Sequence, residues 1–173
     1  MSGVALVGGA GVFLLTGAPA SAVESTPSLA SYFCILTVNY PHGSTHVSGT
    51  INVTATTTCP TAMSSIYIDV ELQRTSPNPN TWFNGTGITT SGKTNASDNQ
   101  ATSCSQGPGT FRGWATTTIV PPPGYVLTGS PTDSKWGTAV GVACGLSKST
   151  AAQGTTSDTV LVEYEPVAQS PIK

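Results

Sequence analysis

Hydrophobic and polar residues alternate with a period of two along much of this chain. In Ser65 to Arg74 one face carries Ile66, Ile68, Val70 and Leu72, and the other carries Tyr67, Asp69, Glu71 and Gln73. A period of two is that of a β-strand with one buried face. No stretch after the first residues sustains the helical period, so the pattern predicts strands and no helices.

Other stretches repeat this alternation between turn-forming segments. Strands are predicted at Tyr32 to Tyr40, Val47 to Cys59, Thr110 to Val120, Thr138 to Cys144 and Asp158 to Glu165, with weaker candidates at Trp82 to Thr90 and Gln100 to Cys104. The segments TSPNPNTW, TTSGKTNASDNQ and VPPPGYVLTGSPTDSKWG are rich in Pro, Gly, Asn and Ser and predict turns. We therefore expect an all-β, antiparallel, immunoglobulin-like β-sandwich of about seven to nine strands.

The start of the chain has the pattern of an export signal. Residues 1–22 are apolar and uncharged and end in Ala18-Pro19-Ala20-Ser21-Ala22, the small-x-small pattern that a signal peptidase accepts. The usual basic residues are missing, which would fit a true start upstream of Met1. We expect a signal peptide over 1–22, one sandwich domain over 23–173, and a secreted, extracellular protein.

Charge narrows the possible partners. Six basic and eight acidic side chains give a net charge of -2, and the basic residues are scattered. Nucleic acids and anionic membranes both select clusters of Lys and Arg, so neither is an expected partner. Phosphate-binding loops and dinucleotide fingerprints are absent, and we expect no cofactor.

The four cysteines of an exported chain predict two disulfides. Three connectivities are possible. Strand phase places Cys34, Cys59 and Cys144 on core-facing positions, which favours the sequence-local pairs Cys34–Cys59 and Cys104–Cys144. No C-x2-C spacing is present, so disulfides are favoured over a zinc site.

The segment FRGWATTTIVPPPGY, residues 111–125, contains the main candidate surface. In a regular strand Arg112 and Trp114 share the solvent face with threonines, close enough for the guanidinium to lie against the indole. The alternative is a bulge at Gly113 that turns Trp114 into the core, which the usual burial of indoles favours. For Trp82 and Trp136 we expect packing rather than recognition.

Catalytic and metal-binding patterns are weak. His42 and His46 in PHGSTH have the spacing of helical metal ligands, but Pro41 and Gly43 oppose a helix, and we expect loop histidines and no metal. The pairs Asp69/Glu71 and Glu163/Glu165 each share one strand face. Alternation places them on the solvent side, where burial would not shift the pKa of a carboxyl group. No G-x-S-x-G elbow is present.

Three segments together resemble a family. YPHGSTHVSGTINVTATTTC, ATSCSQGPGTFRGWATTTIVPPPGY and a late GVAC are similar to a group of small exported proteins from actinobacteria, over roughly Cys34 to Cys144. The resemblance implies an exported, disulfide-bonded protein of actinobacterial origin. The group has no assigned activity, so the resemblance implies no catalytic residue.

These observations predict a secreted, non-catalytic extracellular module that binds a protein or polysaccharide partner. The candidate binding residues are Arg112, Trp114, Tyr125, His42 and His46. One alternative is a secreted hydrolase that uses the strand carboxylates. The other is a proteinase inhibitor that presents the rigid VPPPGY loop.

Overall fold

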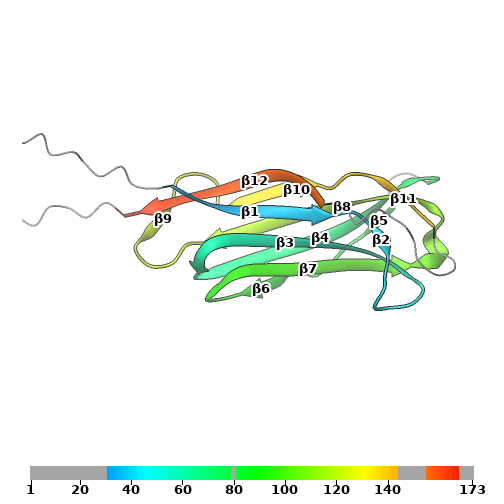
Figure 1. Cartoon of the computed structure of the whole chain (residues 1–173), viewed down its shortest axis with the longest axis horizontal. Coiled ribbons are helices and arrows are strands. Elements are labelled where there is room, and N and C mark those ends of the chain that lie inside the picture. The colour runs from blue at the N-terminus through cyan, green and yellow to red at the C-terminus, as the bar shows by residue number, and fades with distance from the viewer. Residues whose placement is uncertain (1–30, 79–80, 144–154, 168–173) are drawn as a thin grey trace, which may run out of the picture.

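The computed structural model describes residues 31–78, 81–143 and 155–167, and only the backbone over 155–161. Two antiparallel sheets lie face to face, and their strands run along the long axis of the molecule (Figure 1). The only helical turn in these ranges is a 3-10 turn at Cys104–Gln106. The predicted all-β, antiparallel architecture is confirmed.

The first sheet, sheet A, has the order β2-β3-β1-β12-β9, and β7 also pairs with β3. Its strands are β1 (Tyr32–Asn39), β2 (His42–Gly43), β3 (Thr50–Met63), β7 (Lys93–Ser103), β9 (Tyr125–Leu127) and β12 (Thr155–Pro166). The neighbouring strands β1 and β12 are antiparallel, so the first and last described residues lie at the same end of the sandwich (Figure 1).

The second sheet, sheet B, has the order β10-β8-β4-β5, with β11 also pairing with β8 and β6 with β4. Its strands are β4 (Ser65–Ser76), β5 (Thr81–Phe83), β6 (Ile88–Thr90), β8 (Gly109–Val120), β10 (Thr132–Trp136) and β11 (Val140–Val142). Strands β5 and β11 lie at the end of the sandwich away from the described termini (Figure 1).

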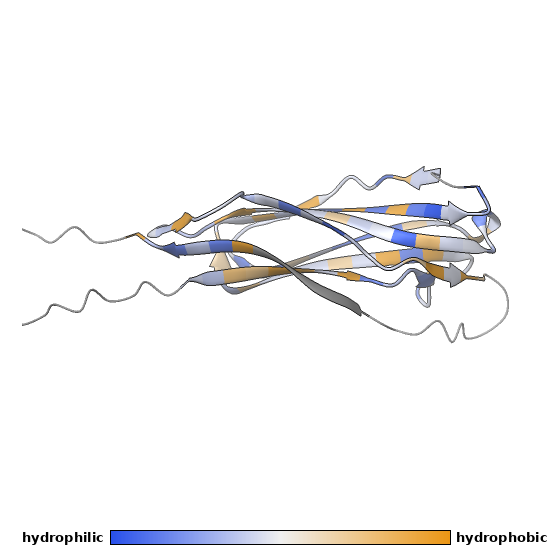
Figure 2. Cartoon of the chain, turned by 90° about the horizontal axis from the view of Figure 1, so that it is seen from above, coloured by the Kyte–Doolittle hydropathy of each residue, from blue (hydrophilic) through white to orange (hydrophobic). Residues whose placement is uncertain are grey.

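The alternating hydrophobic residues meet between the sheets. Ile66, Ile68, Val70 and Leu72 of β4 are fully buried, as the period of two predicts. They face buried residues of sheet A such as Leu36, Val38, Ile51 and Val53. Figure 2 shows hydrophobic and hydrophilic positions alternating along the strands of both layers.

Three strands lie where the sequence predicts turns. β7 runs through TTSGKTNASDNQ, and β9 and β10 run through VPPPGYVLTGSPTDSKWG. With the short strand β2, and with Trp82 to Thr90 divided into β5 and β6, twelve strands are seen in the described ranges, more than expected. β7 and β10 are largely polar and show little hydrophobic alternation, and β9 is too short to show a period.

The predicted pair Cys34–Cys59 forms a disulfide. Ile35 and Thr58 are paired on neighbouring antiparallel strands; Cys34 directly precedes the first and Cys59 directly follows the second, with their Cα atoms 4.2 Å apart. Both sulfur-bearing side chains are buried in the core. Cys144 lies outside the described residues, and the second predicted pair stays a prediction.

Two threonines form a polar link across the core. Thr57 Oγ1 of sheet A donates to Thr117 Oγ1 of sheet B at 2.9 Å, and Thr117 Oγ1 donates to the carbonyl oxygen of Tyr67 at 3.0 Å. Both threonines are fully buried. The donors of this chain are therefore satisfied without water, and the chain joins the two sheets.

We expect Thr117→Val to destabilise the fold more than Thr57→Val. The first change leaves the buried hydroxyl of Thr57 without its acceptor, at a cost of about 1 to 3 kcal/mol, whereas the second removes one net hydrogen bond, worth about 1 kcal/mol. The double variant should be no less stable than Thr117→Val alone, because the stranded hydroxyl is gone. Urea unfolding of the four proteins measures this, and strictly additive losses would contradict it.

Candidate functional site: an indole row on the outer face of sheet B

Strand β8 is regular through Gly113. Its pairing with β4 continues without a shift from Phe111 to Val120. Gly113 points into the core, and Arg112 and Trp114 point away from it on the outer face of sheet B. The expectation of a bulge that buries Trp114 is therefore wrong, and the Arg-Gly-Trp sequence places two large side chains outside and none inside.

All three tryptophans of the chain meet on this outer face. The ring centroids of Trp114 and Trp136 lie 4.7 Å apart, and those of Trp136 and Trp82 lie 5.4 Å apart. Trp82 is 39% exposed and Trp136 is 38% exposed. We call Trp82, Trp114 and Trp136 the indole row, with Trp136 in the middle.

Strand register explains how the row forms. Trp136 of β10 lies opposite Trp114 of β8, which lies opposite Glu71 of β4. Two residues further along, at the next side chain on the same face, Arg112 of β8 lies opposite Gln73 of β4, which lies opposite Trp82 of β5. Trp136 and Trp82 stand on opposite edges of the four-strand path, so their indoles reach towards each other over the residues between them.

Polar groups support the row from below. Arg112 Nε donates to Gln73 Oε1 at 2.7 Å, and the guanidinium carbon of Arg112 lies 3.8 Å from the ring centroid of Trp136. Gln73 is only 3% exposed although its strand position faces outwards. The indoles and Arg112 therefore cover Gln73, and the cation–π contact holds one face of Trp136.

The expected role of Trp82 and Trp136 is only partly right. Both indoles pack, but they pack against each other and Trp114 on the outer face instead of in the core. The expected contact of Arg112 with the neighbouring Trp114 is replaced in the structure by its stacking on Trp136 of β10. Residues of separate strands make this surface, so spacing within one segment did not reveal it.

Carboxyl groups adjoin the indole row. Glu71 and Asp69 follow each other on the outer face of β4, and Asp98 of β7 accepts backbone hydrogen bonds from Val70 and Asn99. Burial raises the pKa of Glu71, and the nearby Asp69 raises it further. Burial also raises the pKa of Asp98, with a smaller contribution from Asp69, while the two backbone hydrogen bonds oppose the shift.

The expectation that burial would not shift the pKa of these carboxyl groups is therefore wrong for Glu71.

The backbone of the segment between β5 and β6 lies close to this part of β4. A Cβ atom at Gly85 would lie 2.9 Å from Asp69 Oδ1, and one at Gly87 would meet the ring of Tyr67. Burial, followed by Asp69 and Asp98, raises the pKa of Tyr67 as well. Asp69 Oδ1 and Asp98 Oδ2 are buried and have no hydrogen-bond partner among the described residues.

We expect Glu71→Gln to stabilise the protein at neutral pH. A raised pKa means that the folded state binds the Glu71 proton more tightly than the unfolded chain. The contribution of Glu71 to the free energy of unfolding therefore falls as pH rises from the ordinary carboxyl range, about 4 to 5, through the raised value. Urea unfolding at about pH 4.5 and about pH 7 should show the larger gain at pH 7.

The matched control for this test is Glu163→Gln, in which the carboxylate lies on β12 of the other sheet. An equal gain in both variants would show a general effect of net charge instead of a local one. A gain for Glu71→Gln that is larger at the acidic pH would contradict the assigned direction.

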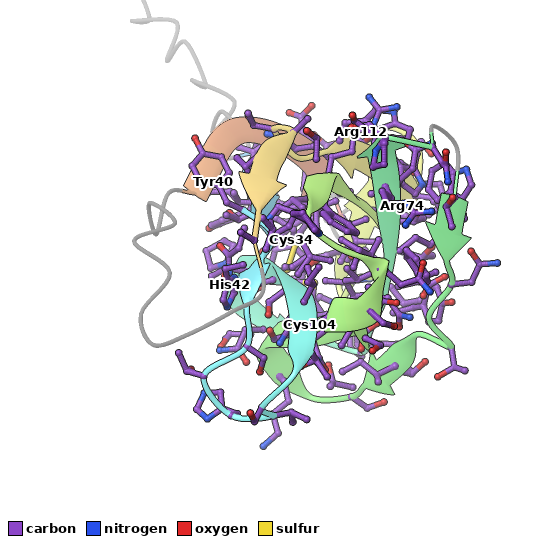
Figure 3. All side chains as sticks on the ribbon, turned by 90° about the vertical axis from the view of Figure 1, so that its right-hand side faces the viewer. Cys34, Tyr40, His42, Arg74, Cys104 and Arg112 are labelled. Atoms are coloured by element: carbon purple, nitrogen blue, oxygen red, sulfur yellow. A yellow bond between two sulfur atoms is a disulfide. The ribbon has the colours of Figure 1, made fainter. Side chains whose placement is uncertain are left out.

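The other predicted binding residues lie elsewhere. Tyr125 of β9 packs with Tyr32 and Tyr164 at ring-centroid distances of 5.9 and 5.7 Å in sheet A. His42 Nδ1 lies 3.0 Å from the carbonyl oxygen of Tyr40, which can only accept, so this nitrogen carries the proton. Figure 3 shows Arg112 on a different side of the sandwich from Tyr40 and His42.

His46 is exposed and lies in the connection between β2 and β3. Both of these strands belong to sheet A, whereas the indole row lies on sheet B. The five predicted binding residues therefore do not form one site. Only Arg112 and Trp114 lie together, and the structure adds Trp82, Trp136, Gln73 and Glu71 to them.

Two further findings limit the chemistry of the described ranges. No three His, Cys, Asp or Glu side chains there lie close enough together to hold a metal ion. Within the same ranges no helix has the length and apolarity needed to cross a membrane. No protein-family model, curated protein or solved structure matches this chain.

Proposed function

We propose that this protein is a non-catalytic extracellular module that binds a polysaccharide through the indole row. The main support is that all three tryptophans gather on the outer face of sheet B. Trp82 on β5 is 39% exposed and Trp136 on β10 is 38% exposed, at the two edges of the four-strand path. Burying an indole on a partner releases more apolar area than burying almost any other side chain. Exposed indoles grouped on one face are therefore a strong mark of a binding surface.

A polysaccharide fits this face better than a protein. Protein interfaces are enriched in Trp and Arg, but their apolar core is depleted of Glu and Asp. Here the carboxyl group of Glu71 stands directly opposite Trp114 in the middle of the sheet face. A pyranose ring has apolar C–H faces that stack on indoles and hydroxyl edges that hydrogen-bond to carboxylates, amides and guanidinium groups. Rings and polar groups alternate on this face in the same way.

Export and a second disulfide belong to the same proposal. The signal-like residues 1–22 and the buried disulfide Cys34–Cys59 support an oxidising, extracellular location. The backbone at Cys104 lies close to the backbone at Val142, since a Cβ atom built on Gly107 would lie 3.6 Å from the carbonyl oxygens of both residues. This proximity supports a Cys104–Cys144 pair. We also propose an immunoglobulin-like sandwich, supported by the two facing antiparallel sheets. Disulfide mapping by mass spectrometry would test the second pair.

The binding test is affinity electrophoresis of the mature protein through gels that contain neutral glucans, mannans, xylans or chitin oligomers. We expect one of these polysaccharides to retard the wild type. Trp136→Ala should weaken that binding by at least about tenfold, because it removes the middle ring of the row and the partner of Arg112.

The matched control is Phe33→Ala, which removes an aromatic side chain of equal exposed fraction, 38%, from β1 of sheet A. This variant should migrate like the wild type. Equal losses in both variants would show non-specific apolar adhesion. Retention by a secreted or cell-surface protein, and by none of the polysaccharides, would overturn the proposal in favour of a protein partner.

A hydrolase is the second candidate, because burial raises the pKa of Glu71, which lies directly opposite Trp114. A carboxyl group with a raised pKa holds its proton more tightly, as a general acid requires. Glu71 and Glu163 lie on different sheets and cannot act as a pair. We expect no release of reducing ends from a bound polysaccharide, and release that Glu71→Gln abolishes would establish the hydrolase instead.

A further inference from the structure

The rings of the indole row are not coplanar. The planes of Trp114 and Trp136 make an angle of 50°, and those of Trp136 and Trp82 make an angle of 48°. A flat ligand surface can lie fully against only one of two rings that are inclined in this way. A flexible chain can turn between one ring and the next, so the row fits a chain whose successive sugar units face different directions.

Hydrogen-bonding side chains continue from the row along the same sheet face. Thr116 Oγ1 and Ser134 Oγ are 3.0 Å apart, and Thr118 Oγ1 and Thr132 Oγ1 are 2.8 Å apart, one and two steps beyond Trp114 and Trp136. Each hydroxyl keeps further capacity to donate or accept. A dissolved chain leaves its sugar hydroxyls free to bond to these groups, whereas in a crystal most hydroxyls are already bonded to neighbouring chains.

Charge decides between neutral and anionic chains. The carboxyl group of Glu71 lies directly opposite Trp114, and that of Asp69 lies opposite Thr116 on the same face of β4. Arg112 is the basic residue that contacts the row. Like charges placed at an interface cost several kcal/mol, so polysaccharides that carry carboxylate, sulfate or phosphate groups are disfavoured.

We infer that the ligand of the indole row is a single, dissolved, uncharged glycan chain and not the flat face of a crystalline polysaccharide. The chain stacks on the inclined indoles in turn, and its hydroxyls bond to Glu71 and to the Thr116/Ser134 and Thr118/Thr132 pairs. This inference rests on the proposed function and adds the physical form and charge of the polysaccharide.

The test compares dissolved and crystalline forms of the same backbone. The probes are hydroxyethylcellulose against microcrystalline cellulose, chitohexaose against crystalline chitin, and alginate as an anionic chain. Calorimetry measures binding to the dissolved probes, and depletion from solution measures binding to the solids. We expect a dissolved neutral probe to bind at least about tenfold more tightly than its crystalline partner, and alginate not to bind.

The outcomes separate this inference from the proposed function. Equal or tighter binding to the crystalline form, or binding to alginate, overturns the inference and leaves polysaccharide binding intact. No binding to any of these probes, together with no retardation in the glucan, mannan, xylan and chitin gels, overturns both if the protein shows native unfolding behaviour. A second variant, Thr116→Val, removes a hydroxyl beside the row without touching an indole. It should weaken binding of the dissolved probe about two- to tenfold, and an unchanged affinity counts against the hydroxyl contacts.

Discussion

Replacing Gly113 by valine is expected to destabilise the protein by about 3 kcal/mol, the upper part of the range for overpacked cores. A Cβ atom at this position would lie 2.7 Å from Val53 Cγ2 and 2.9 Å from Val38 Cγ1. Both valines are fully buried on neighbouring strands of sheet A. Because β-branched side chains have few rotamers, they cannot move aside without moving the sheet. The free energy of unfolding in urea measures the effect.

A compensating change identifies the cause. Gly113→Ala should cost less than Gly113→Val, and should cost less still in a Val53→Ala background, where the nearest atom is gone. The matched control is Gly141→Ala on β11, because a Cβ atom there has no neighbour within 4 Å. Equal effects at both glycines would point to backbone preferences instead of close sheet packing.

Removing the Cys34–Cys59 disulfide should also cost about 3.5 kcal/mol. The bond closes a segment with a sequence separation of 25 residues. In the chain-entropy model, a crosslink over about 25 residues stabilises by about 3.5 kcal/mol, because the unfolded chain loses conformational freedom. The variant to compare with the wild type is the double change Cys34→Ala and Cys59→Ala, which leaves no free thiol at the site.

The measurement is again urea unfolding, with the slope of the transition recorded as well as its midpoint. Loss of the crosslink allows the unfolded chain to expand, so the slope should rise while the midpoint falls. Both cysteines are buried in the core, so a small part of the loss comes from missing contacts. An unchanged midpoint would contradict the prediction and would show that the disulfide adds no stability to the pairing of β1 with β3.

Four of the long strands were predictable because their side-chain pattern is local. β1, β3, β4 and β8 contain runs of alternating apolar residues, and all four begin within a few residues of the predicted position. The phase of alternation likewise placed Cys34 and Cys59 on the core face, where they form a disulfide. For Arg112 and Trp114 it allowed an outward orientation but left a bulge at Gly113 open, because an isolated glycine within a strand pattern fits either arrangement.

The site itself depended on contacts that no local pattern contains. Trp136 stands on β10, which the sequence places in a turn segment, and Trp82 stands on the three-residue strand β5. Desolvation of Glu71 arises from its neighbours in space, while its strand position alone indicates exposure. Sequence by itself determined which side chains of β1, β3 and β4 face the core, because their apolar residues alternate. Only the tertiary structure decided which strands lie side by side and in what register, because these pairings join residues far apart in the chain and depend on the packing of both sheets.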